Sequence, residues 1–425
     1  MKQPFKFFPR QLYDGILLLG LFFLSTRRIL VCWHVINLDY YCEYGSDFTD
    51  YILWGLVVLG AWLLLIQHGK LNEYWLAWKM NWVLGLFLLY SMTSASWSIV
   101  PESSIHTIYI MVAASLTGAA MAVTYSPKQL LKIFFYFTIV SGIISLVLVI
   151  SYPNAGIHQD RVWSGAWRGI FVHKNDLGAL MALANGLSLL SFVHSRGWRD
   201  MFINISCYLL TFFLIVMSRS ATGLALWAIL NGLSLIYFIW MRRYSKLQGK
   251  NIIYLSTLSV AVALLGLLSL IAVVLLLGKS FNLSGRVPMW INLLKYVVPQ
   301  KPWFGYGLET LWYFPTFQKW LGAISGWGIA IVLNGHSGYM DILLYLGLVG
   351  LVLLCIILAQ GLVRATGRAL IGRTWLDFFP LLMFLYFLTA NITSSYILNY
   401  ESFHWIVLVM LIFLPLGKFV EPESA

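Results

Sequence analysis

Two arginines and a histidine border apolar runs long enough to cross a membrane, where ionisable side chains are uncommon. Arg219 lies in "SRSATG" between two such runs, Arg286 lies in "SGRVPMW", and His336 lies in "NGHSGYMDILL", where another run begins. A guanidinium group binds phosphate through paired hydrogen bonds. An imidazole titrates near neutral pH and suits a general base. If they meet, these residues can hold a leaving diphosphate and activate a hydroxyl.

Each of these residues also has a purely structural explanation. An arginine at the end of a span can extend its side chain to the membrane interface. A histidine at a helix start can hydrogen-bond to its own backbone. Asp341 lies inside an apolar run, so we expect it to face the bundle interior, where it orients a neighbouring group or pairs with an arginine.

Six residues are further candidates for contact with a substrate. His173 and Lys174 in "FVHKNDLG" either anchor the outer end of a span or contact phosphate or sugar. The full set of secondary candidates is Arg161, Arg168, His173, Lys174, Tyr339 and Asp341.

The composition is that of a polytopic membrane protein. Of 425 residues, 60% are hydrophobic and only 10% are charged, with a mean hydropathy of +0.80. Soluble globular proteins carry about 25% charged residues. In such a protein the basic residues behind the net charge of +12 mainly set the membrane topology. We therefore expect membrane lipids and phosphate-bearing substrates as partners, and no nucleic acid.

Apolar runs of span length recur along the whole chain and predict about twelve transmembrane helices in one integral membrane domain, 1–425. The predicted spans lie near 13–31, 51–67, 81–97, 106–125, 133–151, 177–194, 201–217, 221–240, 252–278, 338–362, 377–396 and 403–417. Short loops such as "MRRYSKLQGK" carry the larger share of Lys and Arg, which predicts that both termini are cytoplasmic.

With this topology, the outer side carries two large segments, 151–175 and 279–337. The second is long for a connection and rich in aromatic residues, which favours an ordered, functional loop. Trp290, Leu293, Leu294 and Val297 recur at helical spacing, which predicts an amphipathic helix on the membrane surface. Arg219, Arg286 and His336 all fall on this outer side.

Cofactor chemistry is not indicated. The outer histidines lack a Cys/His/carboxylate cluster at metal-ligand spacing, and the sequence has no Gly-rich nucleotide loop. We therefore expect no metal and no cofactor, and a donor that arrives already activated on a lipid. Cys207 and Cys355 lie in apolar runs as expected core residues, whereas Cys32 and Cys42 flank a loop that permits a disulfide.

Four motifs, in this order, resemble the O-antigen ligase and O-antigen polymerase superfamily, whose relatives include exopolysaccharide polymerases. They are "RGIFVHKNDLGALMALA", "MSRSATGLALW", "LSGRVPMWINLLKYVVPQKPWFGYGLETLW" and "NGHSGYMDILLYLGLVGL". The resemblance covers residues from about 161 to 362.

The resemblance implies an all-α, GT-C-like glycosyltransferase of the bacterial inner membrane with a large, partly helical periplasmic loop near 279–337. Such enzymes take a glycan from undecaprenyl diphosphate at the periplasmic side, without metal. By matching motifs, Arg219 and Arg286 hold the diphosphate and His336 is the base for inverting attack. Ser337 stands where the family's motif has Asn.

Three functions remain open at this point. A polymerase passes the glycan to another lipid-linked repeat unit, whereas a ligase passes it to lipid A core. The stretch "HKNDLG" resembles the exopolysaccharide polymerases and favours the first. A lipid-linked oligosaccharide flippase also needs arginines for diphosphate, but should line both leaflets with charge. A membrane scaffold has no need of a histidine where a loop re-enters the membrane.

Overall fold

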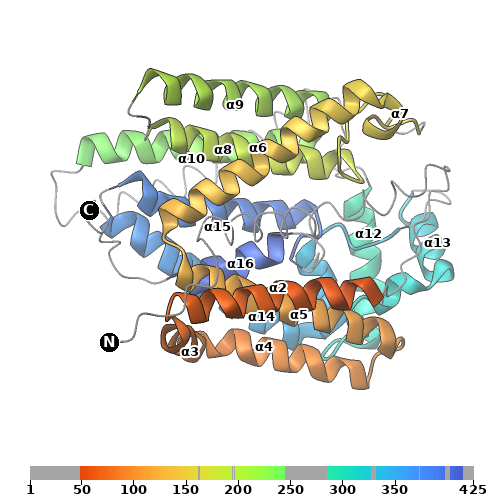
Figure 1. Cartoon of the computed structure of the whole chain (residues 1–425). Helices are drawn as coiled ribbons and strands as arrows, with labels where there is room; N and C mark the ends of the chain where they lie inside the picture. The colour runs from red at the N-terminus through yellow and green to blue at the C-terminus, as the bar shows by residue number, and fades with distance from the viewer. Residues whose placement is uncertain are drawn as a thin grey trace.

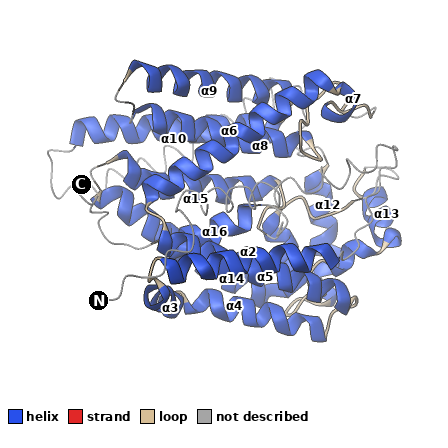
Figure 2. Ribbon diagram, viewed as in Figure 1, coloured by secondary structure: helices blue, strands red, loops and turns tan. Residues whose placement is uncertain are grey.

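The computed structural model describes residues 48–160, 163–193, 195, 197–244, 285–326, 332–372, 374–397 and 403–414. Over these residues the chain is helical, with a single isolated bridge between Ile157 and Trp167 as extended pairing. Figure 2 shows the helices as one bundle joined by loops. The prediction of an all-α membrane protein is confirmed for this part of the chain.

The helices of the first half run in chain order from α2 to α10. They are α2 (Phe48–Gln67), α3 (Leu71–Met80), α4 (Trp82–Thr93), α5 (Pro101–Thr124), α6 (Pro127–Ser151), α7 (Pro153–Gly156), α8 (Lys174–Val193), α9 (Trp198–Met217) and α10 (Ala221–Tyr244).

The second half contains α12 (Arg286–Asn292), α13 (Pro315–Ile324), α14 (Gly338–Ile371), α15 (Trp375–Thr393) and α16 (Phe403–Phe413). Between α12 and α13 lie a π-helical turn (Leu293–Val297) and two 3₁₀ turns (Val298–Gln300 and Thr310–Tyr313). The segment expected to be partly helical is therefore helical in several short pieces.

Among the described residues, seven helices are long and apolar enough to cross a membrane, or eight if a bent pair is one span. That pair is α2 and α3, which meet at 115°. The apolar stretches Trp82–Ser96 and His404–Phe413 are shorter. The predicted spans 13–31 and 252–278 fall outside the described residues, so the total of twelve stays a prediction.

Local sequence signals explain where several spans begin. Ser126 caps α6, where its side chain and that of Gln129 bond reciprocally to backbone N–H groups, and Pro127 occupies the first helical position. Thr374 and Asp377 form the same capping box at the start of α15. These caps satisfy N–H groups that a helix leaves without an internal partner.

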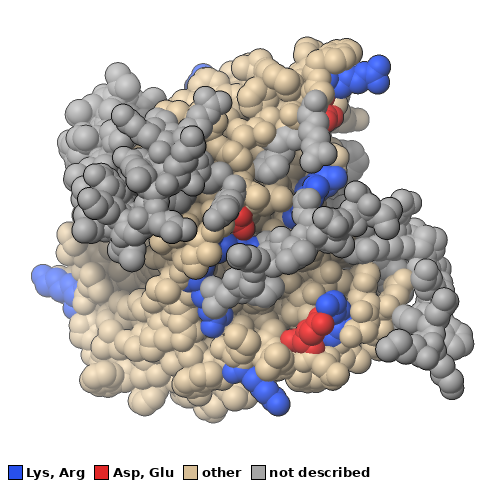
Figure 3. Space-filling model, turned by 90° about the vertical axis from the view of Figure 1, so that its left-hand side faces the viewer, with Lys and Arg blue, Asp and Glu red and all other residues tan. Residues whose placement is uncertain are grey.

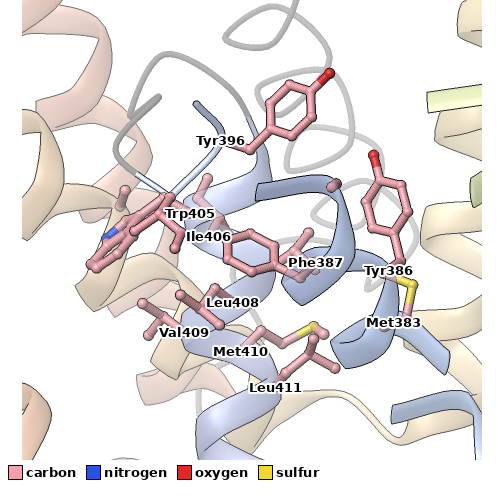
Figure 4. Close-up of a cluster of buried hydrophobic side chains, with 14 of the residues drawn as sticks. Met383, Tyr386, Phe387, Tyr396, Trp405, Ile406, Leu408, Val409, Met410 and Leu411 are labelled. Carbon is pink, nitrogen blue, oxygen red and sulfur yellow. The ribbon is translucent and has the colours of Figure 1, made fainter. Parts of the chain in front are cut away.

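In Figure 1, α9 lies at one edge of the bundle, next to α8 and α10, and α4 lies at the other. Helices α15 and α16 run through the middle. Figure 4 shows their core cluster, which combines Phe387 of α15 with Trp405, Leu408 and Met410 of α16. Burying this apolar surface contributes to the packing of the spans against one another.

Helices α8 and α10 approach closely where both carry glycine. A Cβ on Gly223 would lie 2.8 Å from backbone atoms of Gly178. Small residues at such crossings let two backbones meet inside a membrane protein. The contact fixes the start of α8 against the start of α10, which brings Lys174 beside Arg219.

Two sequence predictions about side-chain environment are wrong. The face of Leu293 and Val297 was expected on the membrane surface, but both side chains are buried against the protein, while Leu294 remains 48% exposed. Helical spacing reports one apolar face and cannot say whether lipid or protein covers it. Cys355 was expected in the core, yet it is exposed on α14, and Cys207 is half-buried. Cys32 and Cys42 lie outside the described residues.

The end of the bundle opposite α7, α12 and α13 faces the viewer in Figure 3. On its described surface, Lys and Arg are more frequent than Asp and Glu. This bias agrees with the predicted cytoplasmic side. The orientation in the membrane stays a prediction.

Helix α14 is interrupted at Gly347, which has φ 64° and ψ −164°. The segment before α13 supplies the backbone partners that the break removes. Tyr306 N–H donates to the Leu344 carbonyl (2.9 Å), and Leu348 N–H donates to the Pro302 carbonyl (2.8 Å). The Tyr90 hydroxyl donates to the Leu346 carbonyl (2.8 Å). A break in an apolar span is stable only when its backbone groups find such partners.

Replacing Gly347 by alanine tests this break. The added Cβ would collide with the Trp303 backbone and sit at dihedral angles that only glycine adopts readily. Strain and overpacking together predict a loss of about 2–4 kcal/mol in the free energy of unfolding. The measurement is thermal unfolding of the purified protein in detergent. Gly367→Ala, in the same helix and with open space around it, is the matched control and should be neutral or slightly stabilising.

Candidate active site

Several helices start at one end of the bundle, near α7 and α12 in Figure 1. His173 directly precedes α8, Arg219 lies two residues before α10, and Arg286 is the first residue of α12. His336 lies two residues before α14. The first turns of α8, α10 and α14 point backbone N–H groups and the positive ends of their dipoles toward this region, which favours a bound anion.

The turn that carries His336 is held on both sides. Gly335 N–H donates to the buried Asp341 carboxylate (2.8 Å), and the Trp290 indole N–H donates to the Gly335 carbonyl (2.8 Å). His336 N–H donates to the Asn334 side-chain oxygen (2.9 Å). His336 itself has φ 49°, a left-handed conformation that costs a non-glycine residue of order 1–3 kcal/mol. The surrounding bonds maintain this strained backbone.

Trp290 also explains how Arg286 reaches the histidine. Arg286 and Trp290 are four positions apart in α12, so they share a helix face. Trp290 in turn bonds to Gly335, the residue before His336. Burial, which is the largest cause, the charge of Arg286 and the neighbouring His173 together lower the pKa of His336 to about 3. The structure therefore brings Arg286, His173 and His336 into one electrostatic group.

Asp176 and Tyr396 also interact with Arg286. Burial lowers the pKa of the Arg286 guanidinium, and Tyr396 and Asp176 act in the opposite direction. The Tyr396 hydroxyl donates to the Asp176 carboxylate (3.1 Å), and its ring stacks on His404 with centroids 4.3 Å apart. Figure 4 shows the hydroxyls of Tyr386 and Tyr396 pointing away from the aliphatic side chains of the core.

Arg219 lies beside this group. It has φ 50°, so both Arg219 and His336 occupy left-handed backbone conformations. Its carbonyl accepts a hydrogen bond from the Lys174 ammonium (2.9 Å), and its exposed guanidinium donates to the Ser164 carbonyl (3.3 Å). Ser220 donates to the Asn175 side chain (2.9 Å). His173 and Lys174 are adjacent in the sequence. Lys174 contacts Arg219 and His173 interacts with His336, so this pair connects Arg219 to the cluster of Arg286 and His336.

The other candidate residues have different surroundings. Arg168 is half-buried and donates through Nε to the Ala155 carbonyl (2.8 Å). The Tyr339 hydroxyl donates to the Leu388 carbonyl (2.9 Å) and so joins α14 to α15. Asp341 faces the bundle interior, as expected, and bonds to the backbone of the His336 turn. Arg161 lies outside the described residues.

Ser337, which departs from the family's motif, donates to the Asn391 carbonyl (3.2 Å). The side-chain oxygen of Asn391 accepts hydrogen bonds from the N–H groups of Tyr396 (2.9 Å) and Ile397 (2.6 Å). These bonds attach the loop after α15, with Tyr396, to the start of α14.

Sequence reasoning missed four polar residues of this region: His158, Asp160, Asp176 and Tyr396. His158 bonds through Nδ1 to the Asp160 carboxylate (3.0 Å) and through Nε2 to the N–H of Lys174 (3.2 Å). Burial lowers the pKa of His158, and Arg168 lowers it further. Asp176 had a sequence signal, because it is a carboxylate in the first turn of a span. For Tyr396 the sequence offered no signal beyond its place at the end of an apolar run.

Comparison with known proteins gives one family. Residues 206–355 match the family model described as O-Antigen ligase. The matched segment contains Arg219 and Arg286 together with His336. No curated protein matches the chain. The match confirms the resemblance to the O-antigen ligase and polymerase superfamily, and the apolar helices support an integral membrane protein.

The two histidines with strongly lowered pKa predict an acid-sensitive fold. In the folded protein the pKa of His173 and of His336 is about 3, below the ordinary value of 6.5. Between these values the unfolded chain binds protons that the folded chain does not, so stability falls as the pH drops below 6.5. At pH 5, about 1.5 units below the ordinary pKa, we expect a loss of about 2 kcal/mol per histidine. The measurement is the unfolding temperature at pH 7 and at pH 5.

His336→Asn is the matched variant, because asparagine tolerates the left-handed backbone at this position. It should make the unfolding temperature less dependent on pH over this window. An unchanged dependence in both His336→Asn and His173→Asn contradicts the assignment.

Proposed function

We propose that the protein is a glycosyltransferase that moves a glycan from undecaprenyl diphosphate to an acceptor hydroxyl at the periplasmic face of the bacterial inner membrane. The reaction is inverting and needs neither metal nor cofactor. The observation that carries the proposal is the junction of Arg286 and His336, two residues far apart in sequence that the Trp290–Gly335 hydrogen bond places together.

The donor diphosphate binds where the cations and the helix starts meet. Arg286 contacts it from α12 and Arg219 contacts it from the turn before α10. A guanidinium beside the leaving diphosphate stabilises the negative charge that develops as the glycosidic bond breaks. Because Asp176 and Tyr396 already interact with Arg286, they orient this guanidinium before the donor arrives.

His336 is the general base. It is neutral in the resting protein and can therefore accept a proton. The acceptor hydroxyl gives its proton to the imidazole, its oxygen bonds to the anomeric carbon, and the carbon–oxygen bond to the diphosphate breaks. The electron pair of that bond leaves with undecaprenyl diphosphate. A bound diphosphate also offsets the positive charge of Arg286, which raises the pKa of His336 and makes it a stronger base.

Asp341 acts through the backbone in this scheme. Its carboxylate holds Gly335, and a Cβ on Gly335 would lie 2.7 Å from that carboxylate oxygen. The sequence alternatives for Asp341 were pairing with an arginine or orienting a neighbour, and its contact supports the second. Asp341 is thus a positioning residue for His336.

The acceptor distinguishes two versions of the function. A polymerase, which extends lipid-linked O-antigen or exopolysaccharide repeat units, is favoured by the "HKNDLG" stretch at the start of α8. A ligase, which transfers the glycan to lipid A core, is favoured by the description of the matching family model. We retain the polymerase as the first choice. The flippase is less favoured because the candidate phosphate-binding residues gather at one end of the bundle.

Purified protein in nanodiscs with an undecaprenyl-diphosphate oligosaccharide tests the function. Donor alone should give a ladder of longer lipid-linked glycans if the protein is a polymerase. A single shifted product that requires lipid A core identifies a ligase. Bound donor without product in either reaction contradicts glycosyl transfer and supports transport.

A further inference from the structure

His173 caps the start of α8 with its imidazole ring. Its Nδ1 accepts a hydrogen bond from the N–H of Asn175 (3.2 Å), and its carbonyl accepts one from Asp176 N–H (3.0 Å). A nitrogen that accepts from a backbone N–H carries no proton. The proton of neutral His173 is therefore on Nε2, which is a hydrogen-bond donor.

Neighbouring rings hold His173 in place. The Trp163 ring meets it edge-on, with centroids 4.6 Å apart and an interplanar angle of 89°. The His158 ring lies 5.4 Å away at 66°. His158 is itself fixed, because Asp160 and the N–H of Lys174 occupy its two nitrogens. The orientation of His173 is thus set before any ligand binds.

Its place at a helix start and its buried, positively charged surroundings keep His173 uncharged. It stands at the N-terminus of α8, where the helix dipole disfavours a cation. The pKa of His173 is lowered to about 3, first by burial and then by its neighbours His158, Lys174 and Arg286, against a smaller opposing effect of Asp160. Within the part of the chain that the structure describes, its Nε2 has no hydrogen-bond partner. A neutral N–H donor therefore stands beside Arg286 and His336.

We propose that His173 contacts the substrate, with its Nε2–H donating a hydrogen bond to a phosphate oxygen of the lipid diphosphate that Arg286 binds. The inference rests on the proposed function and deepens it. Phosphate is favoured over sugar because Arg286, the N-terminus of α8 and the Lys174 ammonium surround the ring with positive charge. A neutral donor in that position adds a hydrogen bond without repelling the two arginines.

The same geometry separates the roles of the two histidines. His173 can take up a proton only at Nδ1, and doing so breaks the capping bond to Asn175. At His336 the bond to the Asn334 side chain is made by the backbone N–H. His173 is therefore a donor to the leaving group and His336 is the base.

Three substitutions at position 173 separate the cap from the donor. Asparagine can cap through its oxygen and donate through its amide, aspartate can only cap, and alanine can do neither. Loss of a donor to developing charge lowers kcat by about 10²–10³-fold in enzymes that stabilise an oxyanion. We expect kcat to fall by about 10²-fold in His173→Ala and His173→Asp, and by less than about tenfold in His173→Asn.

Ser126→Ala is the matched control. It removes the cap of α6, which starts at the far end of the bundle, and should leave turnover unchanged while lowering the unfolding temperature. If capping were the only role of His173, aspartate would rescue as well as asparagine, because an anion suits a helix N-terminus. Equal rates in His173→Asp and His173→Asn overturn the inference, as does a wild-type rate in His173→Ala.

Binding of undecaprenyl diphosphate without a glycan gives a second readout that does not depend on turnover. His173→Ala should bind it about tenfold more weakly or worse than the wild type. If the wild type forms no product but this loss of affinity appears, the proposed function fails and the phosphate contact stands. Unchanged affinity in His173→Ala overturns the contact even where the wild type is active.

Discussion

The hydrogen bond from the Trp290 indole to the Gly335 carbonyl joins the two parts of the site. One part is the short helix that carries Arg286, and the other is the strained turn that carries His336. Arg286 is the first residue of α12 and His336 lies two residues before α14, so the two residues come from different elements. The bond, together with the Asp341 carboxylate on the N–H of the same residue, sets the separation of the base from the phosphate-binding cation.

The scarcity of water explains why so many of the polar contacts here are to backbone. Buried N–H and carbonyl groups need partners, and irregular backbone at membrane depth is tolerated only where protein supplies them. The turn before α14 is satisfied by Asp341 of α14 and Trp290 of α12, and the break at Gly347 is satisfied by the segment before α13. The segment before α13 therefore stabilises α14 through its backbone.

Much of the fold was predictable, because span length and hydropathy follow directly from an apolar solvent. The outer position of Arg219, Arg286 and His336 along the chain was also predictable, since each borders an apolar run. Their mutual placement was not, because a long loop has no period that fixes its path. The buried face of Leu293 and Val297 shows the same limit, as apolar spacing does not identify the covering partner. The tautomer of His173 is set by a single bond from Asn175 N–H that no pattern encodes.

The central claim is that Arg286 binds the diphosphate and His336 takes the acceptor proton. It is tested most directly by measuring donor affinity and single-turnover transfer in parallel for Arg286→Ala and His336→Asn. The account predicts that Arg286→Ala loses donor affinity, by about 10-fold or more for a charge-assisted contact. His336→Asn should bind the donor nearly as the wild type does, yet transfer no glycan. Wild-type transfer by His336→Asn, or unchanged donor affinity in Arg286→Ala, would contradict the account.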